Sequence, residues 1–490
     1  MNGQTLIDLG FQPGRAVGIA LKAAAAAQAN GTPEAETLAA LADVLRAPAA
    51  YADHPVYGAV ADAVMTDTDY NARRSSDSPV PAAPYKVWGR DGIESDALDQ
   101  MKRAVKLPIS VRGALMPDAH PGYGLPIGGV LATDNAVIPY AVGVDIACRM
   151  RLTVFDTSPH ILDQKRERFR TVLEEQTRFG AGSTWSLPRE HEVMDDPLWD
   201  EHTAARLFKD VAWRQLGTSG SGNHFVEFGA LVVNSEIPSP LGTIAPGTYL
   251  ALLSHSGSRR FGLEMANRYT RIAMQMHETL PKEYQHLAWL GLDHSAGAEY
   301  WAAMTLAGRY ASANHAIIHQ QIAEAIGFPV VGGVENHHNF AWQETFDGQD
   351  VIVHRKGATP AGMGVLGVIP GSMGTPGYVV RGLGSAEALN SASHGAGRRL
   401  SRKRAIEKFD WDSVRRYLKE QNVELISAGL DEAPGAYKDI RKVMADQADL
   451  VEALAEFQPR LVKMDGDSPD RRAERQPGKS RQKKGRRRSP

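Results

Sequence analysis

The chain has 490 residues, of which 43% are hydrophobic and 23% charged, with a formal net charge of −2. These proportions are typical of a soluble globular protein, and the length allows two to four domains. No uncharged apolar run reaches the roughly 18 residues of a membrane span, and residues 1–12 lack the pattern of a signal peptide. We therefore expect no membrane partner and a cytoplasmic location.

The net charge hides an asymmetry. Residues 471–490 carry a net charge of +9, which leaves −11 for the rest of the chain. A basic tail on an acidic body is typical of nucleic-acid association, although a solubilising tail without a specific partner has the same composition.

Four segments are expected in chain order. Apolar residues recur at helical spacing through residues 1–70, which predicts a small helical N-terminal module. Segment 71–84 has the composition of a linker. Residues 85–465 mix apolar strands with helices and show no regular βαβ repeat, which predicts one large α+β domain. Residues 466–490 are expected to form a disordered basic tail.

Within the large domain, five elements are specific enough to be placed. Strands are expected at 351–353 and 364–369, a long helix at 296–325, and amphipathic helices at 402–424 and 439–457.

Cys148 is the one cysteine of the chain, so neither an internal disulfide nor a multi-cysteine zinc site is possible. It follows an apolar, glycine-punctuated segment that resembles the end of a buried strand, and Asp145 lies three residues before it. A thiolate beside a carboxylate, in a chain with 16 histidines, indicates a mixed sulfur, nitrogen and oxygen site for a divalent transition metal. The alternative is that a free cysteine serves as a small buried hydrophobic residue.

The histidines gather in polar, glycine-rich segments. Glycine lets backbone amides approach an anion, neighbouring Arg or Lys adds charge, and imidazole suits metal binding or attack on phosphorus. Together they indicate metal-dependent phosphoryl or nucleotidyl transfer. No P-loop pattern is present, which disfavours a P-loop NTPase. If a nucleotide is carried covalently, histidine is the better candidate. His394 is the best placed, because Gly395, Ala396 and Gly397 follow it and Arg398 adds charge.

Eight segments resemble the RtcB family of RNA-splicing ligases, in order, over roughly residues 86–465. They are Pro117–Gly124, Val142–Cys148, Gly222–Glu227, His255–Arg259, His338–Asn339, His354–Ala358, Pro370–Thr375 and His394–Arg398. The resemblance implies a ligase that joins an RNA end bearing a 3′-phosphate or 2′,3′-cyclic phosphate to a 5′-hydroxyl end. The implied cofactors are GTP and two Mn²⁺ per chain, and a monomeric enzyme fits the resemblance.

The resemblance also implies roles for individual residues. Asp145, Cys148 and His224 would bind one metal, and Cys148, His255 and His338 the second. His394 would be the nucleophile that accepts the guanylyl group from GTP. Arg259, Arg355 and Lys356 would contact phosphates. The implied guanylate contacts are Asn223, His224, Phe225, Val226, Glu227, His338, Asn339, Pro370, Gly371, Ser372, Met373, Gly377, His394, Gly395, Ala396, Gly397 and Lys463.

Two positions depart from the family pattern. The family often has serine where this chain has Gly377, which removes one polar contact to the nucleotide. It often has cysteine where this chain has Ser393. Two other functions are alternatives: 3′-end guanylyl capping or metal-dependent phosphodiesterase activity at the same site without sealing, and RNA binding by a non-catalytic protein built on the ligase fold.

Overall fold

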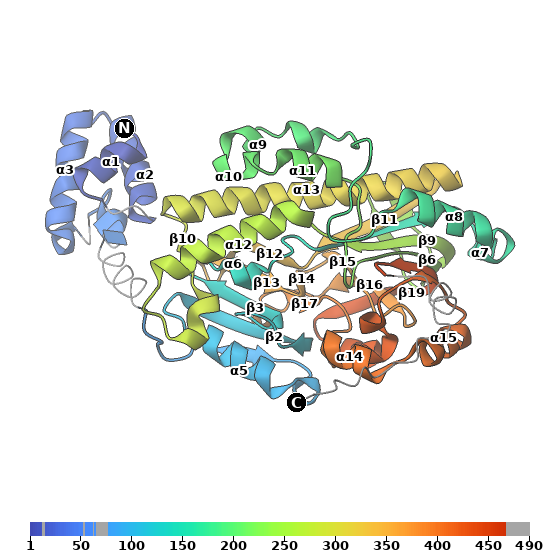
Figure 1. Cartoon of the computed structure of the whole chain (residues 1–490). Coiled ribbons are helices and arrows are strands. Elements are labelled where there is room, and N and C mark those ends of the chain that lie inside the picture. The colour runs from blue at the N-terminus through green and yellow to red at the C-terminus, as the bar shows by residue number, and fades with distance from the viewer. Residues whose placement is uncertain (12–14, 52–53, 62, 65–76, 467–490) are drawn as a thin grey trace, which may run out of the picture.

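The computed structural model describes residues 1–11, 15–51, 54–61, 63–64 and 77–466. It contains two large sheets, several small ones and helices on their faces (Figure 1), which confirms the α+β expectation. Residues 467–490 of the tail predicted at 466–490 and residues 71–76 of the linker predicted at 71–84 lie outside the described residues. No helix in the described part of the chain is long and apolar enough to cross a membrane.

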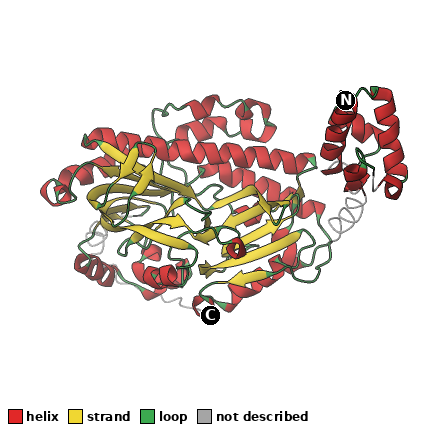
Figure 2. Cartoon of the chain, turned by 180° about the vertical axis from the view of Figure 1, so that it is seen from behind, coloured by secondary structure: helices red, strands yellow, loops and turns green. Residues whose placement is uncertain are grey.

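Three N-terminal helices stand to one side of the sheets (Figures 1 and 2): α1 (Gly3–Leu9), α2 (Arg15–Ala29) and α3 (Glu34–Arg46). The alanine run of α2 buries one face against Leu6, Leu41 and Val44, so these helices share a small hydrophobic core of their own. The predicted helical character of this region is therefore confirmed, whereas the division of the chain into domains stays a prediction.

The smaller of the two large sheets has five strands. Its order is β1 (Tyr85–Val87), β2 (Ser110–His120), β3 (Ile127–Thr133), β13 (Gln349–Lys356) and β12 (Asn339–Phe346). β13 contains the strand predicted at 351–353. One face packs on α5 (Ser95–Ala104), α6 (Pro139–Val142) and α12 (Arg259–Met276). The other face packs on α16 (Ile440–Ala445) and on β17 (Ser391–Ser393), which pairs with β14 (Ala358–Pro360).

The larger sheet has eight strands. Seven follow the order β11 (Val330–His337), β5 (Arg149–Phe155), β9 (Gly247–Ser256), β6 (Phe225–Val233), β19 (Val451–Met464), β16 (Gly377–Gly382) and β15 (Leu366–Ile369), and β18 (Glu424–Ser427) pairs with β19. Asn336 on β11 accepts a hydrogen bond from the Val368 amide of β15 at 2.9 Å. The two edges of the sheet therefore meet, and the sheet curls around its own apolar core.

The long helix α13 (Ser295–Ile326) confirms the helix predicted at 296–325 and lies across both sheets in Figure 1. Its first half packs in the core beside the five-stranded sheet, and its last turns, with α8 (Arg166–Gln176), cover the larger sheet. α7 (Ile161–Gln164), α9 (Leu198–Glu201), α10 (Thr203–Arg206) and α11 (Lys209–Gln215) complete this side. The small sheets pair β4 (Ala136–Val137) with β10 (Leu290–Gly291) and β7 (Ile237–Ser239) with β8 (Gly242–Ile244).

Two predicted elements are wrong in part. The expected helix at 402–424 divides into α14 (Arg402–Lys408) and α15 (Trp411–Glu420), because Asp410 caps a new helix by accepting from the Ser413 amide. The expected helix at 439–457 ends with α16, and strand β19 follows. The apolar residues there repeat at helical spacing, but pairing with β6 and β16 on both sides overrides that local preference.

Candidate active site

A cavity of about 530 Å³ opens where the two large sheets meet. His120 and Lys356 line it from the ends of strands β2 and β13 in the five-stranded sheet. Cys148 and His255 reach it from the larger sheet. His338 stands between β11 and β12, at the point where the chain passes from one sheet to the other. The site therefore draws on both sheets.

Cys148 directly precedes β5, so the expectation that it ends a buried strand is wrong. The residue before it, Ala147, has a left-handed backbone with φ of 54° and donates its amide to the Asn339 carbonyl at 2.6 Å. A left-handed conformation is costly for alanine. It is held here by the contact with the loop that carries His338, and it sets the position at which the Cys148 thiol enters the cavity.

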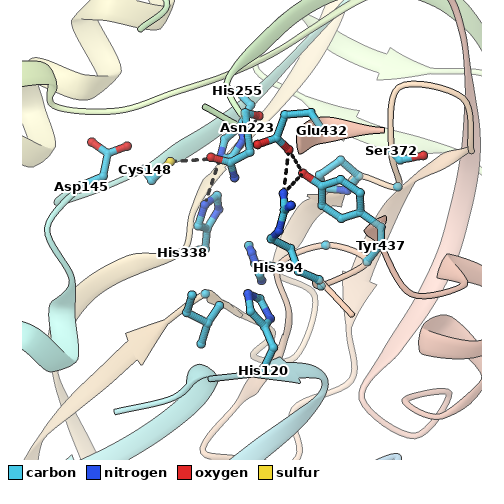
Figure 3. Close-up of a pocket in the computed structure, with 18 of the residues that line it drawn as sticks. His120, Asp145, Cys148, Asn223, His255, His338, Ser372, His394, Glu432 and Tyr437 are labelled. Carbon is cyan, nitrogen blue, oxygen red and sulfur yellow. Dashed lines mark hydrogen bonds and ion pairs between the residues drawn. The ribbon is translucent and has the colours of Figure 1, made fainter. Parts of the chain in front are cut away.

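Five side chains, named here the metal cluster, converge beside Cys148: Asp145, Cys148, His224, His255 and His338. Cys148 Sγ lies 3.0 Å from His255 Nε2 and 3.4 Å from His224 Nε2. His255 Nε2 lies 3.2 Å from His338 Nε2, and His224 Nε2 lies 2.9 Å from Asp145 Oδ2. Figure 3 shows Cys148, His255 and His338 pointing toward one another. Two sets of three donors result, and Cys148 belongs to both.

Backbone carbonyls fix the tautomers of two of these imidazoles. His224 Nδ1 donates to the Ser219 carbonyl at 2.8 Å, and His255 Nδ1 donates to the Asn223 carbonyl at 3.1 Å. A carbonyl only accepts, so a proton stays on Nδ1, and Nε2 is the ring atom that faces the cluster. This arrangement is typical of histidines that bind a metal.

The protonation states also fit a divalent cation. Burial lowers the pKa of His255 to about 3 and that of His338 well below its ordinary value, so both imidazoles are neutral. Burial would raise the pKa of Asp145, but the hydrogen bond and charge of His224 outweigh it and lower that pKa to about 2. Burial and the Asp145 charge raise the pKa of the Cys148 thiol. A cation supplies the positive charge that a thiolate needs here.

His394 lies beside the metal cluster, and its ring centroid is 4.9 Å from that of His338. Its Nδ1 lies 2.6 Å from Oδ2 of the fully buried Asp118, which also accepts from the His394 amide at 3.2 Å. Burial would raise the pKa of Asp118, but the charge and hydrogen bond of His394 lower it. An ionised Asp118 keeps a proton on Nδ1 and leaves the Nε2 lone pair free to attack an electrophile.

The glycine loop after His394 has a structural role in addition to the one expected. The Ala396 amide donates to the Pro370 carbonyl at 3.0 Å, and the His394 amide is taken by Asp118, so these two amides are already paired. Gly397 has φ of 72°, and a Cβ there would clash with the Asp118 carbonyl. The loop therefore brings His394 against Asp118.

A model of the family described as tRNA-splicing ligase RtcB matches residues 100–465. The RNA-splicing ligase RtcB of Escherichia coli strain K12 is 33% identical over 405 residues, which cover 76% of this chain and 95% of the relative. The tRNA-splicing ligase RtcB of Thermococcus kodakarensis is 32% identical over 454 residues, covering 77% and 93%. The RNA-splicing ligase RtcB of Mycobacterium tuberculosis is 31% identical over 432 residues, covering 74% and 98%.

The chain belongs to the RtcB family. The resemblance that the sequence motifs predicted is thereby confirmed, and the motifs of the family converge on one cavity.

Most of the implied guanylate contacts of this RtcB family member line the cavity. Burial raises the pKa of one of them, Glu227, well above its ordinary value, and no charge in the described part of the chain offsets that burial. A buried carboxyl of this kind suits a ligand that brings its own hydrogen-bond donors. The other implied guanylate contacts that line the cavity are Asn223, Phe225, His338, Asn339, Pro370, Gly371, Ser372, Met373, Gly377, His394, Gly395, Ala396 and Gly397.

Three implied guanylate contacts do not line the cavity, and for two of them the reason is that side chains alternate along strands. On β6, Phe225 and Glu227 face the cavity, whereas Val226 between them is buried in the core against α8. On β19, the Lys463 side chain faces away, and its Nζ donates to the carbonyls of Leu173 and Glu174 at 3.0 and 3.2 Å. His224 lies in the metal cluster and not on the cavity surface.

Of the three expected phosphate contacts, one lines the cavity and two do not. Lys356 lines the cavity. Arg355 points to the opposite face of β13, where it pairs with Glu344 at 2.6 Å and donates to Ser391 Oγ at 2.7 Å, so its role in this structure is internal. Arg259 is buried behind the metal cluster, donates to Thr218 Oγ1 at 3.3 Å and helps to lower the pKa of Asp145.

Sequence reasoning did not assign roles to Asp118, Arg402 or Glu432. Asp118 belongs to the Pro117–Gly124 motif, so the motif indicated that its segment is functional, but nothing in the sequence indicated that it contacts His394. Glu432 accepts from Arg398 at 3.0 Å, from Arg402 at 2.6 Å and from the Tyr437 hydroxyl. Figure 3 shows Glu432 and Tyr437 beside the cavity. We name Arg398, Arg402, Asp431, Glu432 and Tyr437 the arginine cluster.

Proposed function

We propose that this chain is a GTP-dependent RNA ligase that joins 3′-phosphate or 2′,3′-cyclic phosphate ends to 5′-hydroxyl ends. The observation that carries the proposal is the position of His394. Its Nδ1 is held by the buried Asp118 at 2.6 Å, and its ring lies 4.9 Å from His338 of the metal cluster. An oriented imidazole beside a cation site is the arrangement that covalent nucleotidyl transfer needs. The names of the E. coli and T. kodakarensis relatives support the same activity.

The metal cluster fits two Mn²⁺ per chain. Asp145, Cys148 and His224 would hold one ion, and Cys148, His255 and His338 the other. One carboxylate, one thiolate and three imidazoles are acceptable ligands for Mn²⁺, which must be selected by geometry and availability. Bound cations would stabilise negative charge on phosphoryl oxygens of the substrates.

In the first step, His394 Nε2 attacks the α-phosphorus of GTP. A nitrogen–phosphorus bond forms, the bond from the α-phosphorus to the bridging oxygen breaks, and pyrophosphate leaves. Asp118 stabilises the positive charge that develops on the imidazole, because its carboxylate faces Nδ1. We place the guanine edge at Glu227, since a carboxylate accepts two parallel hydrogen bonds from the N1 and N2 donors.

In the second step, an oxygen of the RNA 3′-phosphate attacks the guanylyl phosphorus, and His394 leaves. In the third, the 5′-hydroxyl of the other RNA end attacks the original 3′-phosphate, and GMP departs as the phosphodiester forms. A 2′,3′-cyclic phosphate is first opened by hydrolysis to the 3′-phosphate. Lys356, whose side chain lines the cavity, supplies a cation for the RNA phosphate.

We place this reaction in tRNA splicing or in the repair of cleaved RNA, in a reducing cytoplasm where the Cys148 thiol stays available. We also propose that residues 471–490 add a non-specific phosphate contact, because of their net charge of +9.

Incubation with α-³²P-labelled GTP and Mn²⁺ tests the proposal. The full-length protein should acquire an acid-labile label that His394→Ala lacks, and it should join a 3′-phosphate RNA to a 5′-hydroxyl RNA. Label without joined product would replace sealing by capping. No label on a folded protein that still binds RNA would reject the ligase.

A further inference from the structure

Three aromatic side chains meet at the mouth of the cavity and have no part in the steps above. Tyr123 and Tyr140 both line the cavity, with ring centroids 6.3 Å apart. His286, in the short helix Lys282–Leu287, lies 5.7 Å from Tyr123 and 5.2 Å from Tyr140. Tyr123 is 69% exposed. We name these three residues the aromatic rim.

The loop that carries Tyr123 is held rigidly although the side chain is exposed. Gln100 clamps Gly122 from both sides, donating to its carbonyl and accepting from its amide at 3.0 Å. Gly124 has φ of 69° and packs so closely that a Cβ there would clash with the His286 carbonyl. A large exposed ring on a fixed backbone loses little conformational entropy when a ligand binds to it. The Tyr123 ring is therefore preorganised to stack on a planar ligand.

Lys356 connects the aromatic rim to the reacting groups. Its Nζ donates to the Tyr123 carbonyl, and its side chain lines the cavity. The next residue, Gly357, lies against the nucleophile, because a Cβ there would come within 3.2 Å of His394 Cε1. On the other side, Lys356 Cε would lie 3.9 Å from a Cβ on Gly143, two residues before Asp145. Lys356 therefore lies on the cavity wall, with its ammonium group at the Tyr123 loop, its neighbour Gly357 against His394 and its side chain beside the segment that leads to Asp145.

An aromatic surface followed by a cation matches the order of groups in a nucleotide, which is a base and then a phosphate. Unpaired RNA ends are bound by stacking on aromatic side chains with backbone phosphates on nearby cations. The guanine of GTP is the competing occupant. Its candidate contact Ser372 lies on a different side of His394 from His120, which precedes the Tyr123 loop (Figure 3).

We propose that the aromatic rim stacks the unpaired terminal base of an RNA end, while Lys356 holds the adjacent phosphate beside His394. The inference rests on the proposed ligase function, and it adds a base-binding subsite that the reaction steps do not require. It explains why an exposed tyrosine is fixed on a clamped loop at the cavity mouth.

Fluorescence anisotropy with the full-length protein and single-stranded RNA tests the proposal. Tyr123→Ala should weaken binding about 5- to 150-fold, the range expected for loss of one stacked base. Tyr123→Phe keeps the ring and should bind as the unaltered protein does. Tyr123→Leu keeps bulk without a π surface and should resemble Tyr123→Ala. Leu187→Ala removes an 80% exposed side chain outside the cavity lining and serves as the matched control.

The RNA probe is varied in parallel. One set carries a 3′-phosphate and the other a 5′-hydroxyl at the end under study, and each is made with a normal or an abasic terminal nucleotide. The unaltered protein should bind the abasic RNA less tightly, and Tyr123→Ala should not distinguish the two. The set in which this difference appears identifies which RNA end lies on the aromatic rim.

Two results would overturn the proposal. One is equal binding of normal and abasic ends by the unaltered protein. The other is a Tyr123→Ala variant that binds RNA normally but loses guanylylation of His394, which would assign the aromatic rim to the guanine. Binding is measured without sealing, so failure of this subsite differs from failure of the ligase, in which the unaltered protein would neither label nor seal.

Discussion

The metal cluster and the arginine cluster border the same cavity but are stabilised in opposite ways. In the metal cluster, a thiol and three imidazoles face one another with one carboxylate. In the arginine cluster, two guanidinium groups are paired with Asp431 and Glu432 at 2.5 to 3.0 Å. The metal cluster needs a cation to hold its thiolate, carboxylate and imidazoles together, whereas the charges of the arginine cluster already neutralise one another. A chemical change at the first should alter function, and one at the second should alter mainly stability.

The largest effect is expected at His394, which lies between the two clusters. Asp118→Asn should slow guanylylation by about 10⁴-fold, because an amide that donates to Nδ1 places the imidazole proton on Nε2 and blocks its lone pair. The measurement is the rate of ³²P labelling from GTP. Asp99→Asn, which alters an exposed pair with Lys102, is the control. An equal loss of Mn²⁺ binding in Asp118→Asn would show that Asp118 supports the metal cluster instead of positioning His394.

Next in size is the effect of removing the shared ligand. Cys148→Ala should lower the affinity for both Mn²⁺ ions by at least about 100-fold, since loss of an indirect partner of a ligand already costs 10- to 100-fold. Asp145→Ala, which removes a ligand from one set only, should leave one ion per chain. Equilibrium dialysis with metal analysis distinguishes the two. Retention of two ions by Cys148→Ala would refute the assignment of Cys148 as shared.

A smaller effect is expected from pH. Burial lowers the pKa of Lys356 to about 7, so its side chain is mostly charged at pH 6 and mostly neutral at pH 9. Above the pKa, binding of an RNA phosphate must be accompanied by uptake of a proton, so affinity should fall by up to about tenfold per pH unit. Lys356→Arg keeps its charge and should remove this part of the dependence. Parallel pH profiles for the two proteins would exclude the contact.

The smallest effect is expected in the arginine cluster. Glu432→Gln leaves Arg398 and Arg402 without one buried carboxylate and should lower the free energy of unfolding by about 1–3 kcal/mol. Glu452→Gln breaks an exposed pair with Arg381 and should cost less than about 1 kcal/mol. Denaturant unfolding measures both. Mn²⁺ affinity should stay unchanged in Glu432→Gln, and a large loss would join the two clusters into one functional unit.

The elements that the sequence predicted correctly depend on local information. Helix α13 has a long uninterrupted pattern of small and apolar residues, and β13 contains a short run of branched residues. Residues 451–457 were misassigned because the strand to which they belong is determined by partners at 225–233 and 377–382, far away in the chain. No local pattern contains that pairing.

The same distinction applies to the site. The motifs marked the metal cluster and His394, because each ligand sits in a distinctive short segment. Asp118 lies 276 residues before His394, so no local sequence pattern predicts the hydrogen bond between them. Arg355 and Lys463 have the right chemistry, but strand alternation turns both away from the cavity. Residue type indicated the chemistry, and only the register of the sheets decided which side chains reach it.

His338 stands at the passage between the two sheets, and this position has a consequence for how the molecule unfolds. A cation held by His338 and by ligands of the larger sheet is lost when the two sheets separate. Ligand binding to the native state alone adds about 2.7 kcal/mol of stability at a concentration of 100 times the dissociation constant. The cation would thus cross-link the two sheets, so that separation of the sheets and loss of the metal occur in one cooperative transition.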